Sequence, residues 1–263
     1  MHLSLLPSIT CLGLSLAASL EPQGTVSRLV PMTETKRAPV LTRDGGVAGQ
    51  QRIQCYDRTS QQGDSVIATD YMPYISAHNM NNRIESCCFS GIWILYGDEV
   101  YNGQNTQAHN FWAYGENYCT DMPQPFLNEA SSLRYTGHPQ DMFMDSINLY
   151  FNEYFMGDEE FAYNDSPVLN YDNRARSIII TGSSWWTIYE YSNYGGYKAC
   201  LAPGSSGNPA FYGTASNLQQ LSSDISSIAK GCFAKDIIYP DNYVVEGESR
   251  KEAAGTVEGF GFH

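Results

Sequence analysis

Basic residues are scarce in this sequence. Its 263 residues include 15 Lys and Arg against 28 Asp and Glu, which gives a formal net charge of −13. A surface with this charge repels a phosphate backbone, so nucleic-acid binding is excluded. An excess of carboxylates suits a soluble protein or a binder of hard cations. No run of 18 apolar residues occurs after the N-terminus, and no transmembrane segment is expected.

The common catalytic motifs are missing as well. The chain contains no Gly-x-Ser-x-Gly, no His-Glu-x-x-His and no phosphate-binding loop, and its few His are scattered one per segment. His109, near Trp112, is interpreted as a surface or turn residue. Asp158-Glu159-Glu160 is interpreted as solvated charge on an exposed hairpin arm. We therefore predict a protein that is not an enzyme.

Long helical runs of Glu, Lys and Leu are also absent. Aromatic residues make up 13% of the chain, with 19 Tyr, and it holds 23 Gly and 12 Pro. This composition favours many short strands joined by tight turns, and so an all-β fold.

The first 37 residues are interpreted as targeting and processing segments. Leu3 to Leu20 is apolar but broken by Ser, Thr and Pro, and it ends in small residues, which is typical of a secretory signal peptide over residues 1–19. A buried N-terminal strand is the alternative. Residues 20–37 form a pro-segment ending in the dibasic pair Lys36-Arg37, and residues 38–50 an N-terminal arm. Cleavage after Arg37 leaves 12 basic and 26 acidic residues, a net charge of −14, on an extracellular protein.

A repeated aromatic pattern organises the rest of the chain. An aromatic residue is followed seven positions later by a glycine, usually with a second aromatic between them, and each copy precedes a Ser that begins an apolar strand. The copies are Tyr56–Gly63, which is degenerate, Tyr96–Gly103, Tyr150–Gly157 and Tyr189–Gly196, and the Ser residues are Ser86, Ser132, Ser177 and Ser227. The spacings from Tyr to Ser are 30, 36, 27 and 38 residues. Because short and long spacings alternate, the unit of duplication is a pair of motifs.

Each motif reads as a β-hairpin folded back on its sheet. The glycine permits a backbone angle that other residues avoid, and the first Tyr ring packs over the turn. A unit of about 40 residues cannot bury its own hydrophobic face, so two units pair into a sandwich. We expect domains at residues 51–136 and 145–234, a linker at 137–144 and a C-terminal extension at 235–263. In that extension, Ile237–Tyr239 and Tyr243–Val245 are expected to add a strand or cover an edge, and residues 246–263 to be mobile.

Six cysteines remain after the signal peptide, which carries Cys11, is removed. Disulfides are the expected state in an oxidising compartment, and zinc is the alternative, although no Cys-x-x-Cys or His-x-x-x-His spacing supports it. The second domain contains only Cys200 and Cys232, which we expect to pair. The first domain contains Cys55, Cys87, Cys88 and Cys119, which leaves three connectivities.

The pattern aromatic-x4-aromatic-x-Gly, with a Ser on the last strand of each unit, resembles the βγ-crystallin superfamily. The segments Ile147–Gly157 and Trp186–Gly196 are closest to the usual motif sequence of that family, and the resemblance covers about 185 residues. It implies an all-β fold of two βγ-crystallin-like Greek-key β-sandwich domains joined by a short linker. In this topology the strand of Cys55 lies beside that of Cys87 and Cys88. One of these two is then its partner, and they take different partners because neighbours on a strand point to opposite faces.

The resemblance also implies metal sites. In calcium-binding relatives a stretch (Asn/Asp)-(Asn/Asp)-x-x-(Ser/Thr)-Ser ends each motif, and the two stretches of one domain cross to form two calcium sites. Read crosswise, the stretches of this chain pair Asn82 with Ser131, Asn128 with Glu85, and Asp172 and Asn173 with Ser226. The fourth pairing sets Ser223 against Arg176, whose positive charge repels a divalent cation, so that site should be empty. The other interpretation is that these side chains only hydrogen-bond their own turns.

The sequence therefore predicts a secreted, non-enzymatic structural module that binds calcium ions modestly, with no protein partner indicated. Two alternatives stay open: a toxin, defence or inhibitor protein on the same fold, and an extracellular or mineral-matrix protein that does not bind calcium. A toxin would show an exposed apolar patch or a membrane-inserting hairpin, and an inhibitor a protruding strained loop.

Overall fold

The computed structural model describes residues 49–241 and 259–263. The signal peptide, the pro-segment, most of the arm and the Tyr243–Val245 segment lie outside the described residues. No helix within the described ranges is long and apolar enough to cross a membrane. The regular structure consists of β-strands and short 3-10 helices, which are η1 (Ile75–His78), η2 (Val100–Asn102), η3 (Glu153–Phe155), η4 (Ser192–Tyr194), η5 (Ser205–Gly207) and η6 (Ala215–Leu221).

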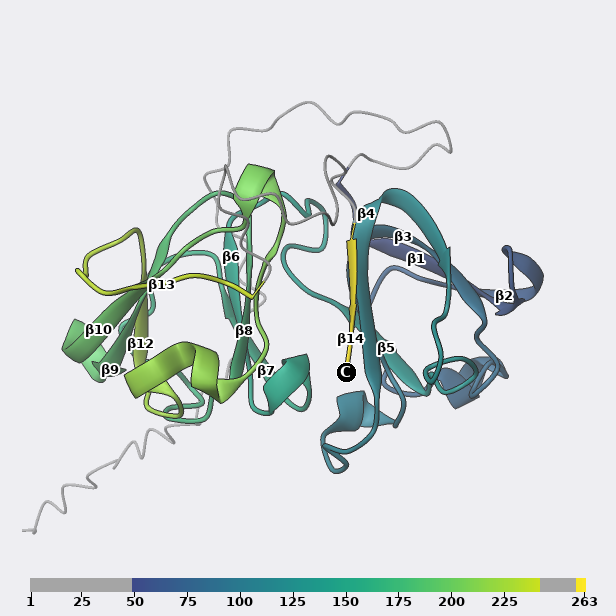
Figure 1. Ribbon diagram of the computed structural model, residues 1–263, viewed down its shortest axis with the longest axis horizontal. Helices are drawn as coiled ribbons and strands as arrows, with labels where there is room; N and C mark the ends of the chain where they lie inside the picture. Colours follow the sequence, from purple (N-terminus) through teal and green to yellow (C-terminus); the bar gives the residue numbers. More distant parts are fainter. Residues whose placement is uncertain (1–48, 242–258) are drawn as a thin grey trace, which may run out of the picture. The chain divides into compact units, whose positions relative to one another are not determined.

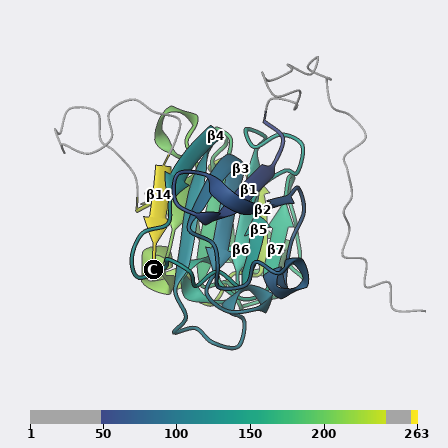
Figure 2. The same cartoon turned by 90° about the vertical axis from the view of Figure 1, so that its right-hand side faces the viewer.

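The first domain is built on one continuous sheet in the order β14-β4-β3-β1-β2, with β5 paired to β3 (Figures 1 and 2). The strands are β1 (Arg52–Arg58), β2 (Gln62–Ala68), β3 (Ser86–Tyr96), β4 (Asn110–Asp121), β5 (Ser132–Tyr135) and β14 (Gly259–Phe262). The pairing of β3 with β4 shifts register at Gly91, whose φ is +105°. A Cβ there would lie 1.9 Å from Oε1 of the buried Gln51, which accepts a hydrogen bond from Ile92 N. Only glycine fits this bend.

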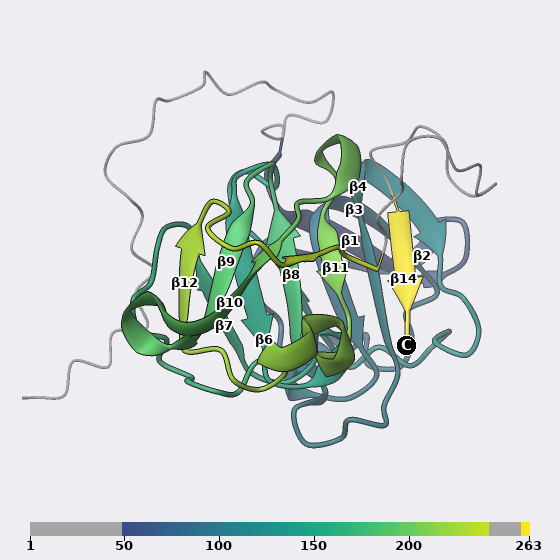
Figure 3. The ribbon, with the colours of Figure 1, turned by 60° about the vertical axis from the view of Figure 1, so that its left-hand side comes forward.

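The second domain consists of two four-stranded sheets, β11-β8-β6-β7 and β12-β9-β10-β13 (Figure 3). The strands are β6 (Ser146–Tyr150), β7 (Glu159–Ala162), β8 (Ser177–Thr181), β9 (Trp186–Tyr191), β10 (Gly195–Leu201), β11 (Ala210–Tyr212), β12 (Ser227–Lys230) and β13 (Ile237–Ile238). β11 comes from the fourth motif but pairs with β8 of the third, while Ser166 of the third motif bridges Ile228 of the fourth. The bridge between Met72 and Leu133 makes the corresponding crossing in the first domain. Each domain is therefore a pair of interlocked Greek keys.

The aromatic residues of each hairpin meet over the turn, as the repeat predicts. Ring centroids lie 5.5–5.7 Å apart, edge to face, in three copies, which are Tyr96–Tyr101, Tyr150–Phe155 and Tyr189–Tyr194. Gly157 and Gly196 have φ of +77° and +74°, which explains the glycine of the motif. The second motif differs in its glycine, because Gly103 has φ −61°, whereas its second aromatic, Tyr101, shares the left-handed backbone of Phe155 and Tyr194.

The Ser of each motif ties its strand to the hairpin. All four Ser residues are fully buried, and each hydroxyl donates to a hairpin carbonyl at 2.7 Å and accepts a hairpin N–H at 2.9–3.0 Å. Ser177, for example, donates to Asn152 O and accepts from Phe155 N. A hydroxyl supplies both roles in a very small side chain, which accounts for Ser in all four copies.

Replacing Ser177 with Ala is expected to lower the free energy of unfolding by about 1–3 kcal/mol, because the Phe155 N–H then lacks a partner in a buried hairpin. Urea denaturation measures the change. Ser65→Ala, at an exposed position of β2, is the control and should change stability by less than about 0.5 kcal/mol. Equal losses in the two variants would contradict a structural role for the motif Ser.

Each domain has its own hydrophobic core, and a third cluster of buried side chains joins the two. Strand β3 contributes to both kinds of core, because Trp93 and Leu95 pack inside the first domain whereas Ile92 and Ile94 belong to the joining cluster. A strand that is buried on both faces is apolar at every position, which is why this stretch shows no alternation in the sequence.

The three disulfides agree with the expectations from cysteine spacing and topology. Cys200 pairs with Cys232, and in the first domain the bonds are Cys55–Cys87 and Cys88–Cys119. The first-domain bonds join residues directly opposite each other across β1 and β3 and across β3 and β4. The neighbouring Cys87 and Cys88 therefore use opposite faces of one strand.

Asp158 is exposed, as expected, but the interpretation as solvated charge is wrong for Glu159 and Glu160. The Tyr71 hydroxyl donates to Glu159 at 2.5 Å, and the backbone amides of Asn170 and Tyr171 each donate to Glu160 at 2.9 Å. These partners come from other loops, one of them about 90 residues away in the chain, so the local sequence does not reveal them.

The C-terminal extension covers two strand edges. β13 pairs with β10 in parallel, as expected for Ile237–Ile238. The expectation of mobility is wrong at the end of the extension, since β14 pairs antiparallel with β4 and His263 exchanges backbone hydrogen bonds with Asn110. Residues 246–258 lie outside the described residues. A terminal strand gains order by completing the hydrogen bonds of an open edge.

Candidate metal centre

Four loops with one backbone geometry carry the predicted site residues. The second residue of each stretch has a left-handed backbone, with φ of +53° at Asn82, +62° at Asn128, +60° at Asn173 and +77° at Ser223. Asn is the non-glycine residue most tolerant of this conformation, together with Asp. The left-handed residue turns the chain into the last strand of its motif.

The two loops of the first domain cross each other. Asn82 N donates to Ala130 O at 3.0 Å, and Asn128 N donates to Ile84 O at 3.1 Å. These reciprocal bonds bring together the side chains predicted to face each other. The Ser131 hydroxyl donates to Asn82 Oδ1 at 3.1 Å, and Asn128 Nδ2 donates to Glu85 Oε1 at 3.1 Å.

One crosswise pair forms in the second domain. Asn173 N donates to Ile225 O at 3.0 Å, and the Ser226 hydroxyl donates to Asn173 Oδ1 at 3.2 Å and to Glu190 O at 2.7 Å. Asp172 is exposed and makes no hydrogen bond to Ser226. The structure thus brings Asn173, rather than Asp172, to the partner hydroxyl.

The architecture of the chain has a counterpart among solved structures. Geodin, a beta-gamma crystallin from Geodia cydonium, superposes with a TM-score of 0.55 at 20% identity, over 69% of this chain and 99% of that one. This chain has the βγ-crystallin fold.

Other structures with the βγ-crystallin fold match shorter parts of the chain. A betagamma-crystallin from an archaeon is 28% identical over 33% of this chain and 96% of its own, with a TM-score of 0.29. The crystallin of Ciona intestinalis is 19% identical over 32% of this chain and 98% of its own, also with a TM-score of 0.29. No protein-family model and no curated protein matches the sequence.

The fourth crosswise position of the βγ-crystallin fold differs from the other three. Arg176 occupies the place held by Glu85, Ser131 and Ser226 in the other loops. Its guanidinium is half-buried, and its Nη1 makes a 3.4 Å hydrogen bond to Ala175 O. This position offers a fixed positive charge instead of an oxygen ligand.

The three oxygen-bearing pairs fit the dimensions of a hard cation. Two oxygens 3.1–3.2 Å apart can both lie about 2.3–2.6 Å from one calcium ion. In the Asn128–Glu85 pair the amide nitrogen Nδ2 faces the carboxylate, so the Asn128 amide would turn over to offer its oxygen Oδ1 to a cation. The two orientations of an Asn amide have the same shape and differ only in their hydrogen bonds. In the part of the chain that the structure describes, no group of three or more His, Cys, Asp or Glu is placed to hold a metal ion. The polar atoms that these pairs bring together are therefore largely uncharged, with Glu85 as the carboxylate among them.

A carboxylate that the sequence does not single out lies beside the first-domain loops. Glu129 is hydrogen-bonded to His109, with 2.9 Å between Oε2 and Nδ1, and both residues line a hollow of about 330 Å³ together with Asn82 and Asn128. The two residues are 20 positions apart in different strands and loops, so no local motif points to their pairing.

Proposed function

We propose that the chain is a secreted, non-enzymatic structural module that binds calcium ions with modest affinity. The observation that carries this proposal is the crosswise approach of Asn82 to Ser131, Asn128 to Glu85, and Asn173 to Ser226, at 3.1–3.2 Å. Four loops, which cross two by two, bring these side chains together in three pairs at a spacing suited to one ion each.

The chemistry of these pairs supports calcium and a modest affinity. Amide, hydroxyl and carboxylate oxygens are ligands of hard cations, and calcium accepts about 6–8 of them in flexible geometry. Backbone carbonyls such as Glu190 O, which already accepts from Ser226, and water supply the remainder. Affinity rises with the number of charged ligands, and only the Glu85 pair contributes a carboxylate.

Four variants test the proposal site by site. Asn173→Ala and Ser226→Ala should each abolish the site of the second domain, because each removes an oxygen ligand. Glu85→Arg should silence the Asn128 site by placing a positive charge where Arg176 stands in the second domain. Isothermal titration should show one calcium ion fewer than the parent protein in each case. Asn117→Ala is the matched control, since Asn117 also has positive φ but lies on none of the four loops.

Calcium should also stabilise the folded protein. An ion that binds only the native state adds about 2.7 kcal/mol at a concentration of about 100 times its dissociation constant. Each site-removing variant should therefore show a smaller calcium-induced rise in melting temperature than the Asn117→Ala control. If calcium raises the melting temperature equally in all variants, these residues are not calcium ligands.

Secretion is supported by the cysteines. All six cysteines of the described chain form disulfides, which persist in oxidising compartments. N-terminal sequencing of the secreted protein should begin at or close to Ala38, after the dibasic pair Lys36-Arg37. A mature start near Glu21 would remove the pro-segment from the proposal and keep the signal peptide.

A further inference from the structure

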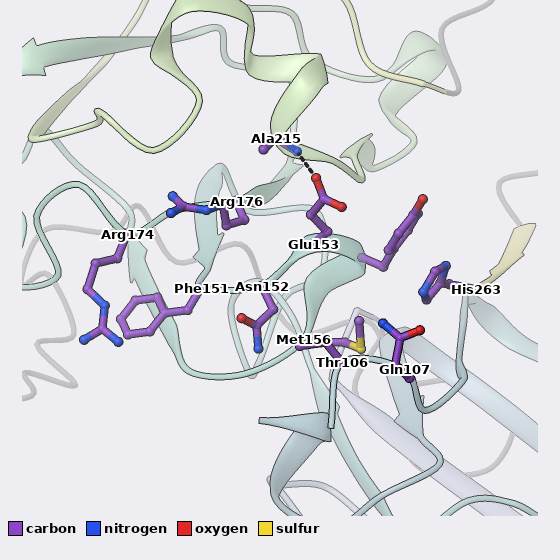
Figure 4. A pocket seen from close by; sticks show the side chains of 11 residues that line it. Thr106, Gln107, Phe151, Asn152, Glu153, Met156, Arg174, Arg176, Ala215 and His263 are labelled. Atoms are coloured by element: carbon purple, nitrogen blue, oxygen red, sulfur yellow. Dashed lines mark hydrogen bonds between the residues drawn. The ribbon is translucent and has the colours of Figure 1, made fainter. Parts of the chain in front are cut away.

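A hollow of about 620 Å³ opens next to the fourth crosswise position of the second domain. Its volume is within the range of small-molecule pockets, about 300–1,000 Å³. Arg174, Phe151 and Arg176 gather at one end, and Glu153 and His263 lie toward the other (Figure 4). The calcium proposal uses none of this space.

The two arginines are not neutralised by acidic side chains. Among the described residues, no carboxylate lies within ion-pair distance of Arg174 or Arg176. Arg83 and Lys230, by contrast, each form an ion pair with an aspartate. The Arg174 guanidinium lies over the Phe151 ring, 4.3 Å from its centroid. A guanidinium stacked on a ring still presents its N–H edge to a ligand. In a chain of net charge −13, this end of the hollow is a local concentration of positive charge.

The first motif provides an internal comparison at equivalent positions. There Arg83, the counterpart of Arg174, forms an ion pair with Asp57 at 2.5 Å, and Asp57 is the counterpart of Phe151. Glu85 is likewise the counterpart of Arg176. Two carboxylates in the first motif are thus replaced by a phenyl ring and a guanidinium in the third, which raises the local charge by three. The loop backbone is the same, so the difference resides in the side chains.

The remainder of the hollow is polar and carries little charge. Thr106, Gln107 and Asn152 contribute hydroxyl and amide groups. Burial, and next the proximity of His109, lowers the pKa of His263, which keeps its imidazole neutral at pH 7. The Glu153 carboxylate accepts a hydrogen bond from Ala215 N at 2.9 Å. With two arginines and one carboxylate, the side chains of the lining have a net charge of +1.

We propose that this hollow binds a short acidic sugar through a single carboxylate or sulfate group. Arg174 and Arg176 would hold the anionic group by charge-assisted hydrogen bonds, and the amides and hydroxyl of Gln107, Asn152 and Thr106 would bind the sugar hydroxyls. The volume exceeds the space that a lone inorganic anion fills. A polyanion is disfavoured because the overall negative charge repels it.

Titration calorimetry of the full-length secreted protein in EDTA tests the proposal. The probes are a disaccharide with one glucuronate, the neutral disaccharide, a monosulfated disaccharide and inorganic sulfate. At least one acidic disaccharide should bind with 1:1 stoichiometry, at least tenfold more tightly than the neutral disaccharide and inorganic sulfate. Binding should weaken as salt is added. Comparing the two acidic probes distinguishes a carboxylate from a sulfate as the group recognised.

Variants locate the binding. The double variant Arg174→Gln/Arg176→Gln should lose at least tenfold in affinity, whereas Arg83→Gln, at the equivalent position of the first motif, should bind as the parent does. Circular dichroism and melting temperature establish that the variants fold. The proposal is overturned by unchanged binding in the double variant, by absence of binding to both acidic disaccharides, or by binding of the neutral disaccharide or inorganic sulfate as tight as that of the acidic disaccharides.

Discussion

Arg134→Met is expected to lower the free energy of unfolding by about 3–5 kcal/mol, the usual cost of removing one partner from a buried charged network. Arg134 lies on β5 of the first domain and is 1% exposed. Its guanidinium donates at 2.9 Å to the Tyr96 hydroxyl and to the carbonyls of Phe155 and Gly157 in the second domain. Truncation leaves both carbonyls without that donor at the junction between the domains.

The surroundings of Arg134 explain why it is charged despite complete burial. Burial alone would lower its pKa, but electrostatic interactions with Tyr96 and Glu159 hold the pKa above its ordinary value. Its guanidinium also lies 4.6 Å from the ring centroid of Tyr101 and 4.8 Å from that of Tyr150. For Tyr101, burial comes first among the causes that raise the pKa to about 12, so this phenol is neutral at pH 7. Glu159 is then the carboxylate that balances the arginine.

Urea denaturation of Arg134→Met, Glu159→Gln and the double variant measures the coupling between the two charges. If the pair acts as described, the double variant should lose less stability than the sum of the single losses, because neither charge is left unpaired. A loss below about 1 kcal/mol in Arg134→Met, or additive losses, would contradict the assigned role.

Replacing Cys55 and Cys87 with Ala removes their disulfide. We expect the free energy of unfolding to fall by about 3–4 kcal/mol from the greater entropy of the unfolded chain alone. Both cysteines are fully buried, so a packing loss adds to this amount. The Cys88–Cys119 bond closes a loop of nearly the same length, 31 against 32 residues, but Cys88 is half-buried and Cys119 is exposed.

Because the two loops have similar lengths, the difference in stability loss between the two double variants measures the contribution of buried packing. Urea denaturation should show a larger loss for Cys55→Ala/Cys87→Ala than for Cys88→Ala/Cys119→Ala. A larger loss for the more exposed Cys88–Cys119 pair would contradict this explanation, and mass mapping that finds any other connectivity would refute the assigned bonds.

The parts of the structure that sequence predicts are those fixed by a repeated local pattern. The aromatic-glycine motif can be recognised in the sequence because a tight left-handed turn and one ring contact define each hairpin, and the Ser follows at a spacing set by the Greek key. The juxtaposition of Asn82 with Ser131 is expected from the resemblance to βγ-crystallins, in whose calcium-binding members the two equivalent loops of one domain cross.

The parts that the sequence does not reveal depend on partners far apart in the chain. Glu159 looks like surface charge until Tyr71 and Arg134 are brought to it across the domain junction. The sequence of β14 resembles a polar tail, and its order depends on pairing with the open edge of β4, which is distant in the chain. Arg176 is recognisable in the sequence as incompatible with a cation, but the hollow beside it needs Thr106 and His263 from distant segments.

Calcium stoichiometry of the parent protein and of Arg176→Ser, measured side by side by titration calorimetry, tests the central claim most directly. The parent should bind three ions, one at each oxygen-bearing pair. Arg176→Ser should bind four, because the substitution removes the positive charge and restores a hydroxyl opposite Ser223. Absence of calcium heats in both proteins, with melting temperatures unchanged by calcium, would contradict the claim and leave the crossing loops as structural turns.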